Sequence, residues 1–408
     1  MKLKIHTQIL IAIVLGLITG LFFSYRKNQP DYIVIEYVGI IGNLFIRLLK
    51  MIIVPLILAS IVTGIISLGD VKRLGRIGLK TFIYYMVTTA LAVTVGLILV
   101  NMIHPGTSVE LPTEQTIDLT QREAPTIISI ITDIIPSNLF DAMANDQVLS
   151  IIFFSILLGV AISSVGGKAK PLASFFEAFN DVMMKITDWI MRLAPFGIFA
   201  LMAYTIGTLG LAVLKPLLLY MVTVAFGLII HACIILPVLL KVFAKYSPLK
   251  LFRDVFSAIA TAFSTASSAA TLPITMDCLQ ENTGVSEKIS SFVLPLGATI
   301  NMDGTALYEA VAAMFIAQAY GIDLGPGQQL VIMLTATLAS IGAAAIPSAG
   351  LITLMIVLKA VNLPVEGIAM ILAVDRVLDM LRTAVNVWGD TCGTVVVAKL
   401  EKEQLNEN

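Results

Sequence analysis

The sequence predicts an all-α polytopic membrane protein, and three observations support that prediction. Hydrophobic residues make up 58% of the 408 residues and charged residues only 13%, against about 25% charged residues in soluble proteins. The mean hydropathy is +0.93. Apolar runs of about 20 residues, the length at which a helix spans a bilayer, recur along the chain.

Up to residue 242 the chain predicts six simple membrane-spanning helices. We expect them at about 8–23, 37–68, 81–103, 148–160, 172–208 and 211–242. Lysines and arginines follow the second and sixth spans, and by the positive-inside rule these connections lie in the cytoplasm. They are Lys72, Arg73, Arg76 and Lys80, and then Lys241, Lys245, Lys250 and Arg253. With the acidic stretch 104–124 outside, both termini are expected in the cytoplasm, and the protein in the plasma (inner) membrane.

After Arg253 the pattern changes and predicts two re-entrant helical hairpins. Small polar residues split the apolar segments at 264–273 and 343–350, so we expect hairpins at about 249–281 and 327–362. Each precedes a helix that we expect to be interrupted, at about 287–322 and 367–402. Broken segments at corresponding positions of two repeats indicate a binding site near the bilayer midplane, where irregular backbone is tolerated only next to a cavity or protein.

A row of polar side chains marks the last of these helices. On a helix at about 100° per residue, its members fall within a stripe about 80° wide and about 22 Å long. They are Asp375, Asp379, Arg382, Asn386 and Asp390, with Thr383 at the edge. The stripe predicts a site for a charged solute and cations, because ionisable groups inside a membrane are costly and usually functional. The alternative, Asp–Arg pairs that only join helices, is strongest for Asp375.

A second polar group interrupts the preceding helix at Asn301-Met-Asp-Gly-Thr305. Unwinding at the glycine would offer backbone carbonyls that, with an amide and a carboxylate, suit a hard cation such as Na⁺. The alternative is a glycine kink with Asp303 bonded to a neighbouring helix. Glu309, in apolar surroundings, is a candidate proton carrier; an uncharged, hydrogen-bonded core acid is the alternative.

Tyr85, Thr88 and Thr89 place three hydroxyls on one face of the third span. In isolation, such hydroxyls more often bond back to the preceding turn of their own helix.

Several other classes of protein lack support in the sequence. The net charge of −1 and the absence of a basic tract do not indicate a nucleic-acid partner. Ser267 and Ser268 have no evident triad partner and no Walker lysine is present, so neither an enzyme nor an ATP-driven pump is indicated. Scattered histidines do not suggest a metal centre. Three cysteines without metal spacing are predicted to be free core thiols: Cys233, Cys278 and Cys392.

Four motifs together make the chain resemble the dicarboxylate/amino acid:cation symporter family. They are Ser267-Ser-Ala-Ala-Thr-Leu-Pro273, Asn301-Met-Asp-Gly-Thr305, Ile346-Pro-Ser-Ala-Gly350 and the stretch from Asp375 to Asp390. The resemblance covers nearly the whole chain. It implies eight transmembrane helices and two re-entrant hairpins in inverted repeats, assembled as a homotrimer that works by an elevator motion.

The resemblance also implies a division of the chain. Residues 1–70 and 104–208, which hold helices 1, 2, 4 and 5 and the exterior loop, would form the scaffold. Residues 71–103 and 209–402, which hold helices 3, 6, 7 and 8 and both hairpins, would form the moving transport domain. Residues 403–408 would be a cytoplasmic tail.

For the substrate, the resemblance implies an acidic amino acid. Arg382 would bind its side-chain carboxylate and Asp379 its α-ammonium group, because Arg forms planar, bidentate contacts with carboxylates. Further contacts would come from Ser267, Ser268, Thr305, Ile346, Gly350, Thr383 and Asn386. Members for neutral amino acids lack the arginine and members for simple dicarboxylates lack the acid, so this chain should prefer glutamate or aspartate.

For the coupling ion, the resemblance implies three Na⁺ sites. The first site would use Gly297, Asn301, Asn386 and Asp390. The second site would use Tyr85, Thr88, Thr89, Asn301 and Asp303. The third site would be formed mainly by backbone around Thr299, Ser340 and Ala343. Glu309 adds possible coupling to H⁺. Ala266 and Met380 stand where archaeal and animal members respectively have an arginine, which leaves potassium counter-transport open. A C4-dicarboxylate symporter and an ion channel of the same architecture are the alternative functions.

Overall fold

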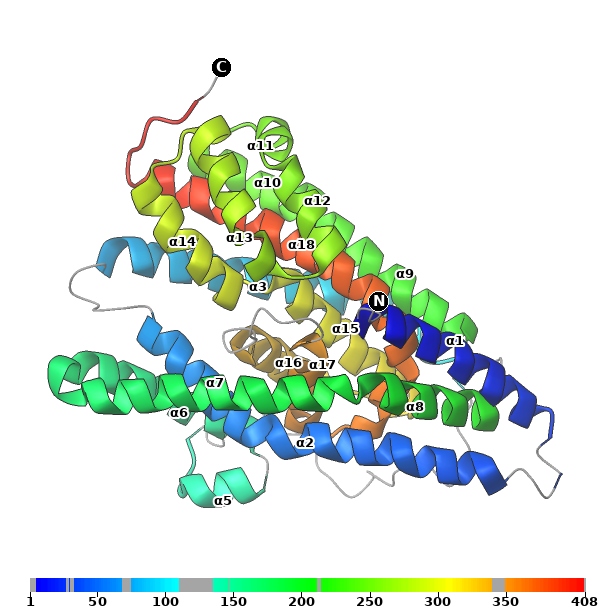
Figure 1. Ribbon diagram of the computed structural model, residues 1–408. Coiled ribbons are helices and arrows are strands. Elements are labelled where there is room, and N and C mark those ends of the chain that lie inside the picture. The colour runs from blue at the N-terminus through cyan, green and yellow to red at the C-terminus, as the bar shows by residue number, and fades with distance from the viewer. Residues whose placement is uncertain are drawn as a thin grey trace.

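The computed structural model describes residues 5–26, 29, 33–67, 75–109, 135–145, 147–210, 214–339 and 349–406, and these ranges form helices joined by turns (Figure 1). They contain no strand, which confirms the all-α prediction for them. Five helical stretches are long and apolar enough to cross a membrane: Thr7–Ser24, Ile33–Ile66, Arg76–Ile103, Leu149–Arg192 and Leu214–Ala244. That the protein has eight transmembrane helices stays a prediction. The exterior loop predicted at 104–124 lies mostly outside the described residues, as do Lys72 and Arg73.

One group of helices forms a layer along the lower side of Figure 1. It contains α1 (Ile5–Ser24), α2 (Ile33–Ser67), α5 (Leu139–Ala144), α6 (Val148–Val165), α7 (Lys170–Arg192) and α8 (Ala194–Leu209). Helix α8 packs against α1 and α2, and α2 packs against α6 and α7. The prediction of a single helix at 172–208 is wrong, because the chain breaks at Leu193 between α7 and α8. Pro195 stands in the first turn of α8, where its missing N–H is tolerated.

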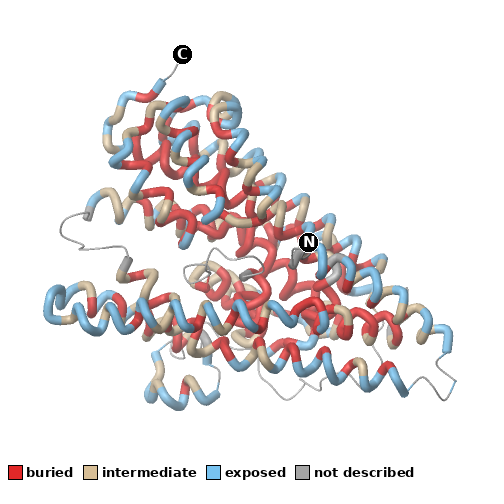
Figure 2. The backbone as a smooth tube through the Cα atoms, viewed as in Figure 1, coloured by how far each residue is buried: buried red, intermediate tan, exposed pale blue. Residues whose placement is uncertain are grey.

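The second group of helices packs around α18 (Ile368–Leu400). In chain order the others are α3 (Gly75–Ile103), α9 (Leu214–Ile230), η5 (His231–Ile235), α10 (Leu236–Leu239), η6 (Leu240–Ala244), α11 (Pro248–Asp254), α12 (Phe256–Thr265), α13 (Ser268–Asp277), η7 (Cys278–Thr283), α14 (Glu287–Ile300), α15 (Asp303–Ala319), α16 (Pro326–Ala339), α17 (Ala349–Ala360) and η9 (Val365–Gly367). Buried residues concentrate on α15 and α18, which therefore form the centre of this group (Figure 2).

A pair of short helices occupies each predicted hairpin. Helices α12 and α13 pack against each other, and between them Ala266 adopts a left-handed conformation with φ 50°. Ser267 then caps α13, its hydroxyl accepting from the Ala270 N–H at 3.2 Å. Helices α16 and α17 form the second pair, and α17 also contacts α2 and α6 of the other group. The tip of this second hairpin, 340–348, lies outside the described residues.

Only one of the two predicted helix interruptions is present. Helix α14 ends at Ile300 and α15 begins at Asp303, with extended backbone at Asn301, which confirms that break. The predicted interruption of the last helix is wrong, because α18 runs continuously over 33 residues. Its Gly389 is tolerated within the helix, and it has a packing reason: an added Cβ would lie 2.8 Å from the Asn301 amide nitrogen.

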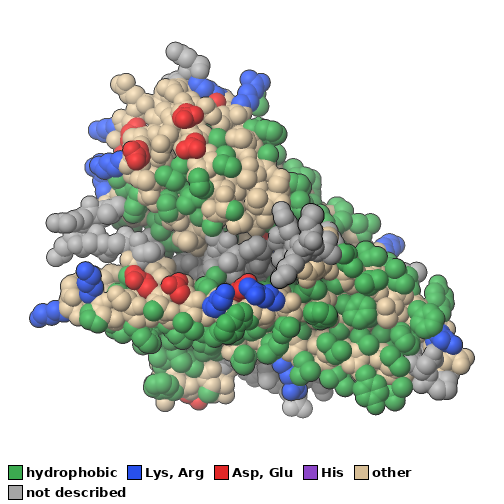
Figure 3. All heavy atoms as spheres, in the orientation of Figure 1, with side chains coloured by type: hydrophobic (Ala, Val, Ile, Leu, Met, Phe, Trp, Pro, Cys, Tyr) green, Lys and Arg blue, Asp and Glu red, His purple; other side chains and the backbone are tan. Residues whose placement is uncertain are grey.

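The surface of the molecule is strongly apolar over part of the first group of helices. Figure 3 shows hydrophobic side chains spread over the region of α1, α2 and α8. Exposed residues of this kind include Val14, Ile18 and Phe22 on α1. Apolar surface of this extent is expected where a protein contacts lipid. Cys233 is also exposed, so its prediction as a core thiol is wrong, whereas Cys278 and Cys392 are buried.

Candidate functional site

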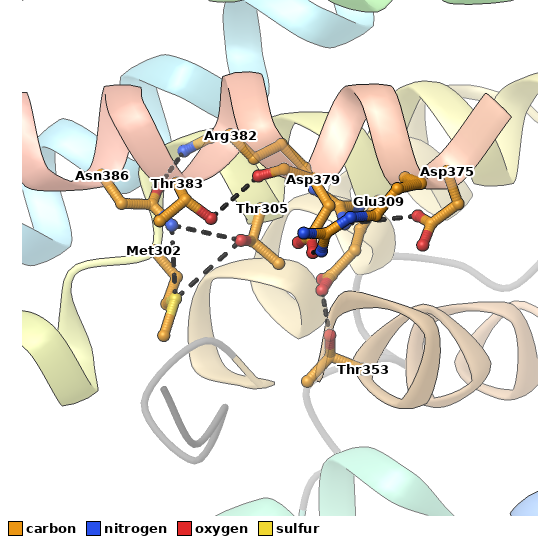
Figure 4. A network of polar contacts seen from close by, with 11 residues as sticks. Met302, Thr305, Glu309, Thr353, Asp375, Asp379, Arg382, Thr383 and Asn386 are labelled. Carbon is orange, nitrogen blue, oxygen red and sulfur yellow. Dashed lines mark hydrogen bonds and ion pairs between the residues drawn. The ribbon is translucent and has the colours of Figure 1, made fainter. Parts of the chain in front are cut away.

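Four charged side chains of α18 form what we call the arginine cluster: Asp375, Arg376, Asp379 and Arg382. Figure 4 labels three of them, Asp375, Asp379 and Arg382. Arg382 is 1% exposed, and its Nη2 donates to Asp379 Oδ1 at 2.9 Å and lies 3.2 Å from Asp375 Oδ1. Arg376 Nη1 donates to the other Asp379 oxygen at 3.2 Å. Two arginines and two aspartates give the cluster a formal charge of zero, which makes its burial feasible.

The Arg382 guanidinium has hydrogen-bonding capacity left over. In the described part of the chain, its Nε and Nη1 are buried and have no hydrogen-bond partner. The Tyr308 ring lies under it, with its centroid 3.8 Å from Cζ, and holds the plane of the group by a cation–π contact. Since a buried donor without a partner is costly, this geometry suits a planar anion such as a carboxylate.

Backbone from the second hairpin approaches the same guanidinium. Gly350 lies in the first turn of α17, and a Cβ added there would be 3.0 Å from Arg382 Nη1. A side chain at Gly350 would therefore crowd Arg382 Nη1, and the glycine avoids this. Ile346, also predicted at this hairpin, lies outside the described residues.

A neutral polar network continues from the arginine cluster along α18. Asn386 Oδ1 accepts from the Gly304 N–H at 2.8 Å, and its amide donates to Thr305 Oγ1 at 3.3 Å. The same amide lies 3.4 Å from the Met302 sulfur (Figure 4). Thr383 is buried and donates to the Asp379 carbonyl at 2.8 Å. This network joins the start of α15 to α18, next to the Arg382 side chain.

Further along α18, a second group of buried side chains forms what we call the Asp303 cluster: Tyr85, Thr88, Thr89, Asn301, Asp303 and Asp390. Asp303 Oδ1 accepts from Thr89 Oγ1 at 2.7 Å and from Thr88 Oγ1 at 3.2 Å. Asp303 Oδ2 lies 2.9 Å from Nε2 of His231 on η5. Helix α3, helix α15 and η5 therefore meet at this carboxyl group.

The other half of the Asp303 cluster is held by Asn301. Its amide donates to Asp390 Oδ1 at 2.9 Å, while its Oδ1 is buried without a hydrogen-bond donor in the described part of the chain. At Gly297 an added Cβ would clash with Asp390 Oδ1 and would lie 2.7 Å from the Tyr85 hydroxyl oxygen. Amide, carboxylate and hydroxyl oxygens thus converge, with one acceptor left over, which is the ligand chemistry of a hard cation such as Na⁺.

Glu309 is fully buried on α15, one turn beyond Thr305. Thr353 of α17 donates its hydroxyl to Glu309 Oε1, and Glu309 Oε2 has no hydrogen-bond partner in the described residues (Figure 4). The candidate proton carrier is thereby joined to the second hairpin.

The remaining predicted residues make other contacts or lie outside the described ranges. Ser267 and Ser268 begin α13, which packs against α18. Thr299 is exposed and bonds to its own helix through the Pro295 and Leu296 carbonyls, so the structure does not bring its side chain into the Asp303 cluster. Ser340 and Ala343 lie outside the described residues.

Sequence reasoning missed four residues that shape these clusters: Tyr308, Thr353, Gly389 and His231. For His231 there was a usable signal, because it is the one residue between Lys215 and Lys241 whose side chain can carry a positive charge, and it stands in an apolar span. No comparable signal marks Tyr308, Thr353 or Gly389, whose roles depend on which helices face each other.

Buried charges and converging buried oxygen atoms, grouped at an interrupted helix and a helical hairpin inside an apolar bundle, are typical of a membrane carrier for charged solutes. The chain belongs to the sodium:dicarboxylate symporter family, whose sequence profile matches residues 5–400.

The similarity to named relatives extends over almost the entire chain. It is 38% identical to the proton/glutamate-aspartate symporter of Escherichia coli, over 98% of this chain and 93% of the relative. It is 37% identical to the proton/sodium-glutamate symport protein of Geobacillus stearothermophilus, over 100% and 96%. The human excitatory amino acid transporter 2 is 38% identical over 98% of this chain and 79% of its own length.

Proposed function

We propose that this protein is a secondary active symporter that takes up acidic amino acids, L-glutamate or L-aspartate, together with Na⁺. The observation that carries this proposal is the pairing of two buried clusters along α18. The arginine cluster has unused donors at Arg382, and the Asp303 cluster has an unused acceptor at Asn301. One cluster suits an anion and the other a cation, and a symporter must bind both.

The substrate class follows from the two ends of an acidic amino acid. The unpaired donors of Arg382 bind the side-chain carboxylate. Asp379 binds the α-ammonium group when it exchanges its contact with Arg376 for the substrate. Asn386, Thr305 and Thr383 add hydrogen bonds at the side of this site. The E. coli relative is named for glutamate and aspartate, the Geobacillus relative for glutamate and the human relative for excitatory amino acids. These names support the choice of an acidic amino acid.

A symporter of C4-dicarboxylates is the second candidate, because the family description names dicarboxylates. Such a substrate has no ammonium group and would leave Asp379 without a partner in the binding site. A channel of the same architecture would pass an uncoupled current and would not concentrate its solute.

We also propose the division into scaffold and transport domain. The packing of α1, α2, α6, α7 and α8 with one another, and of α3, α9 and α12–α17 around α18, supports it. Lys50 on α2 and Glu366 in η9 form an ion pair at 2.7 Å between the two groups. An elevator motion of the transport domain, within a homotrimer, would have to break this contact.

The binding residues on the two hairpin tips are part of the same proposal. Ser267 and Ser268 on one side, and Ile346 and Gly350 on the other, would close over the substrate. Backbone around Thr299, Ser340 and Ala343 would hold a third Na⁺. Glu309 would carry a proton when it gives up its hydrogen bond with Thr353. The protein would lie in the cell membrane with both termini in the cytoplasm.

The deciding experiment is uptake of radiolabelled aspartate, glutamate and succinate into proteoliposomes, under separate Na⁺, H⁺ and K⁺ gradients. We expect saturable, concentrative uptake of aspartate or glutamate that stops when the Na⁺ gradient is collapsed. Preference for succinate would select the dicarboxylate candidate. A large current with no accumulation would contradict the symporter and favour the channel.

A further inference from the structure

His231 lies where the regular α9 helix gives way to η5, a stretch of π-helix. Its side chain is 0% exposed, and its Nε2 lies 2.9 Å from Asp303 Oδ2. A carboxylate can only accept hydrogen bonds, so His231 must donate through Nε2. The contact joins residues 72 positions apart and brings the sixth predicted span to the Asp303 cluster.

The π-helical segment is held on its other side by α18. Trp388 Nε1 donates to the Ala232 carbonyl at 3.0 Å, next to His231 in the chain. Single turns of π-helix are rare and occur often at functional sites, because they change the direction in which side chains leave the helix. Here the segment is fastened to α18 by Trp388 while His231 reaches Asp303.

The contacts of Asp303 account for most of its capacity as an acceptor. An ionised carboxylate offers about four lone-pair positions. Thr88 and Thr89 donate to Oδ1, and His231 donates to Oδ2. Donors on both oxygens fix the plane of the carboxylate and leave about one position for a cation. Without His231, Oδ2 would keep no hydrogen-bond donor among the described residues, and the group could rotate.

We propose that His231 is a positioning residue for sodium binding: by donating to Asp303 Oδ2, it orients the carboxylate toward the cation. This inference rests on the proposed sodium-coupled function. Hydrogen-bond partners of metal-binding side chains act in this way at other metal sites, where their loss typically weakens metal binding about 10- to 100-fold.

The test compares three substitutions at His231. His231→Leu removes the donor, whereas His231→Gln retains an amide donor at the reach of Nε2. His231→Asn offers a similar donor one bond shorter, so it falls short of Asp303. Thr223→Val is the matched control, because Thr223 is equally buried on α9 and, among the described residues, bonds only to its own helix through the Leu219 carbonyl.

The readout is the Na⁺ concentration that gives half-maximal aspartate uptake, with choline keeping the ionic strength constant. We expect His231→Leu and His231→Asn to raise this Na⁺ concentration about 10-fold or more. His231→Gln and Thr223→Val should retain the wild-type value. Size-exclusion profiles and melting temperatures in choline verify folding. If His231→Leu does not fold, the difference between the Gln and Asn variants decides.

A second measurement tests whether His231 acts through Asp303. The Na⁺-induced rise in melting temperature of the purified protein is measured for Asp303→Asn, His231→Leu and the double variant. If His231 works by orienting Asp303, the double variant should be no worse than Asp303→Asn alone.

The outcomes separate this inference from the proposed function. A wild-type protein whose aspartate uptake is independent of Na⁺ contradicts the proposed function and this inference together. Sodium-dependent wild-type uptake combined with an unshifted His231→Leu, or with equal behaviour of the Gln and Asn variants, overturns the inference alone.

Discussion

The arginine cluster and the Asp303 cluster lie on the same helix and are both buried, yet they differ in charge and in what they lack. In the arginine cluster two arginines balance two aspartates. Its donors without a hydrogen-bond partner in the described part of the chain are Arg382 Nε and Nη1, whereas its unbonded acceptor, Asp375 Oδ1, still faces Arg382 Nη2 at 3.2 Å. In the Asp303 cluster two carboxyl groups contact no lysine or arginine in the described part of the chain, and the group without a partner is an acceptor, Asn301 Oδ1.

This difference supports the proposal that one helix binds opposite charges side by side. Burial makes an unsatisfied donor or acceptor costly, so each cluster gains most from a ligand that supplies the missing partner. A balanced ion-pair cluster with spare donors favours an anion. A group of oxygens with excess negative charge favours a cation, and occupancy of one site offsets the charge of the other.

The largest expected effect comes from removing the guanidinium of the arginine cluster. Arg382→Cys should reduce aspartate uptake about 30-fold or more, because truncating one member of a buried charge pair costs about 2–5 kcal/mol. Uptake into proteoliposomes at saturating Na⁺ measures this. Arg192→Gln is the control, since Arg192 pairs with Asp188 at an exposed position. Unchanged aspartate uptake in Arg382→Cys would refute the assignment of the anion site.

The second effect concerns the carboxylates of the Asp303 cluster. Asp390→Asn keeps the size of the side chain and removes its charge, so the Na⁺ concentration for half-maximal uptake should rise about 10-fold or more. Aspartate affinity at saturating Na⁺ should change little, and Asp323→Asn, at an exposed position, should change neither. The opposite pattern, weaker aspartate binding with unaltered Na⁺ dependence, would break the distinction between the clusters.

Two glycines allow a sharper form of the same comparison. Gly297→Ala would push a methyl group against Asp390 and Tyr85, and Gly350→Ala would bring one to 3.0 Å from Arg382 Nη1. We expect the first variant to weaken Na⁺ binding and the second to weaken aspartate binding, both measured from uptake kinetics. Gly78→Ala is the control, because its Cβ would meet only Phe292, at ordinary contact distance. Identical kinetic defects in both variants would mean that the two clusters act as one site.

The smallest effect is expected at an ion pair outside both clusters. Glu401, after the end of α18, lies 2.6 Å from Arg76 Nη2 and 2.7 Å from Lys80 Nζ, and these contacts lower its pKa to about 2. Its ionised form should therefore stabilise the fold fully above the ordinary carboxyl pKa of 4.5, and this contribution should be lost as the pH falls toward 2.

Melting temperatures of wild type and Glu401→Gln check this expectation. The wild type should melt higher at pH 7, and the difference should shrink at pH 3. Aspartate uptake at pH 7 should be the same in both proteins. A transport defect in Glu401→Gln would show that charge near the end of α18 affects transport even outside the two clusters.

Much of this molecule could be predicted from its sequence. Apolar runs of bilayer length gave the all-α class, because a chain in lipid must satisfy its backbone hydrogen bonds within its own helices. Polar side chains at helical spacing placed Asp379, Arg382, Asn386 and Asp390 on one face of α18. The glycine next to Asp303 indicated the break between α14 and α15, which the structure contains.

Other features were decided only by the tertiary structure. Gly304 lies in the first turn of α15 after a helix break, whereas Gly389 lies inside the continuous α18, and the packing of each becomes visible only in the folded protein: Gly304 faces Arg382 backbone and Gly389 faces Asn301. Likewise, the contact of His231 with Asp303, and of Tyr308 with Arg382, depends on which helices become neighbours. Periodicity within a helix determines which residues share a face, but packing between helices determines which buried groups find partners and which are left for a ligand.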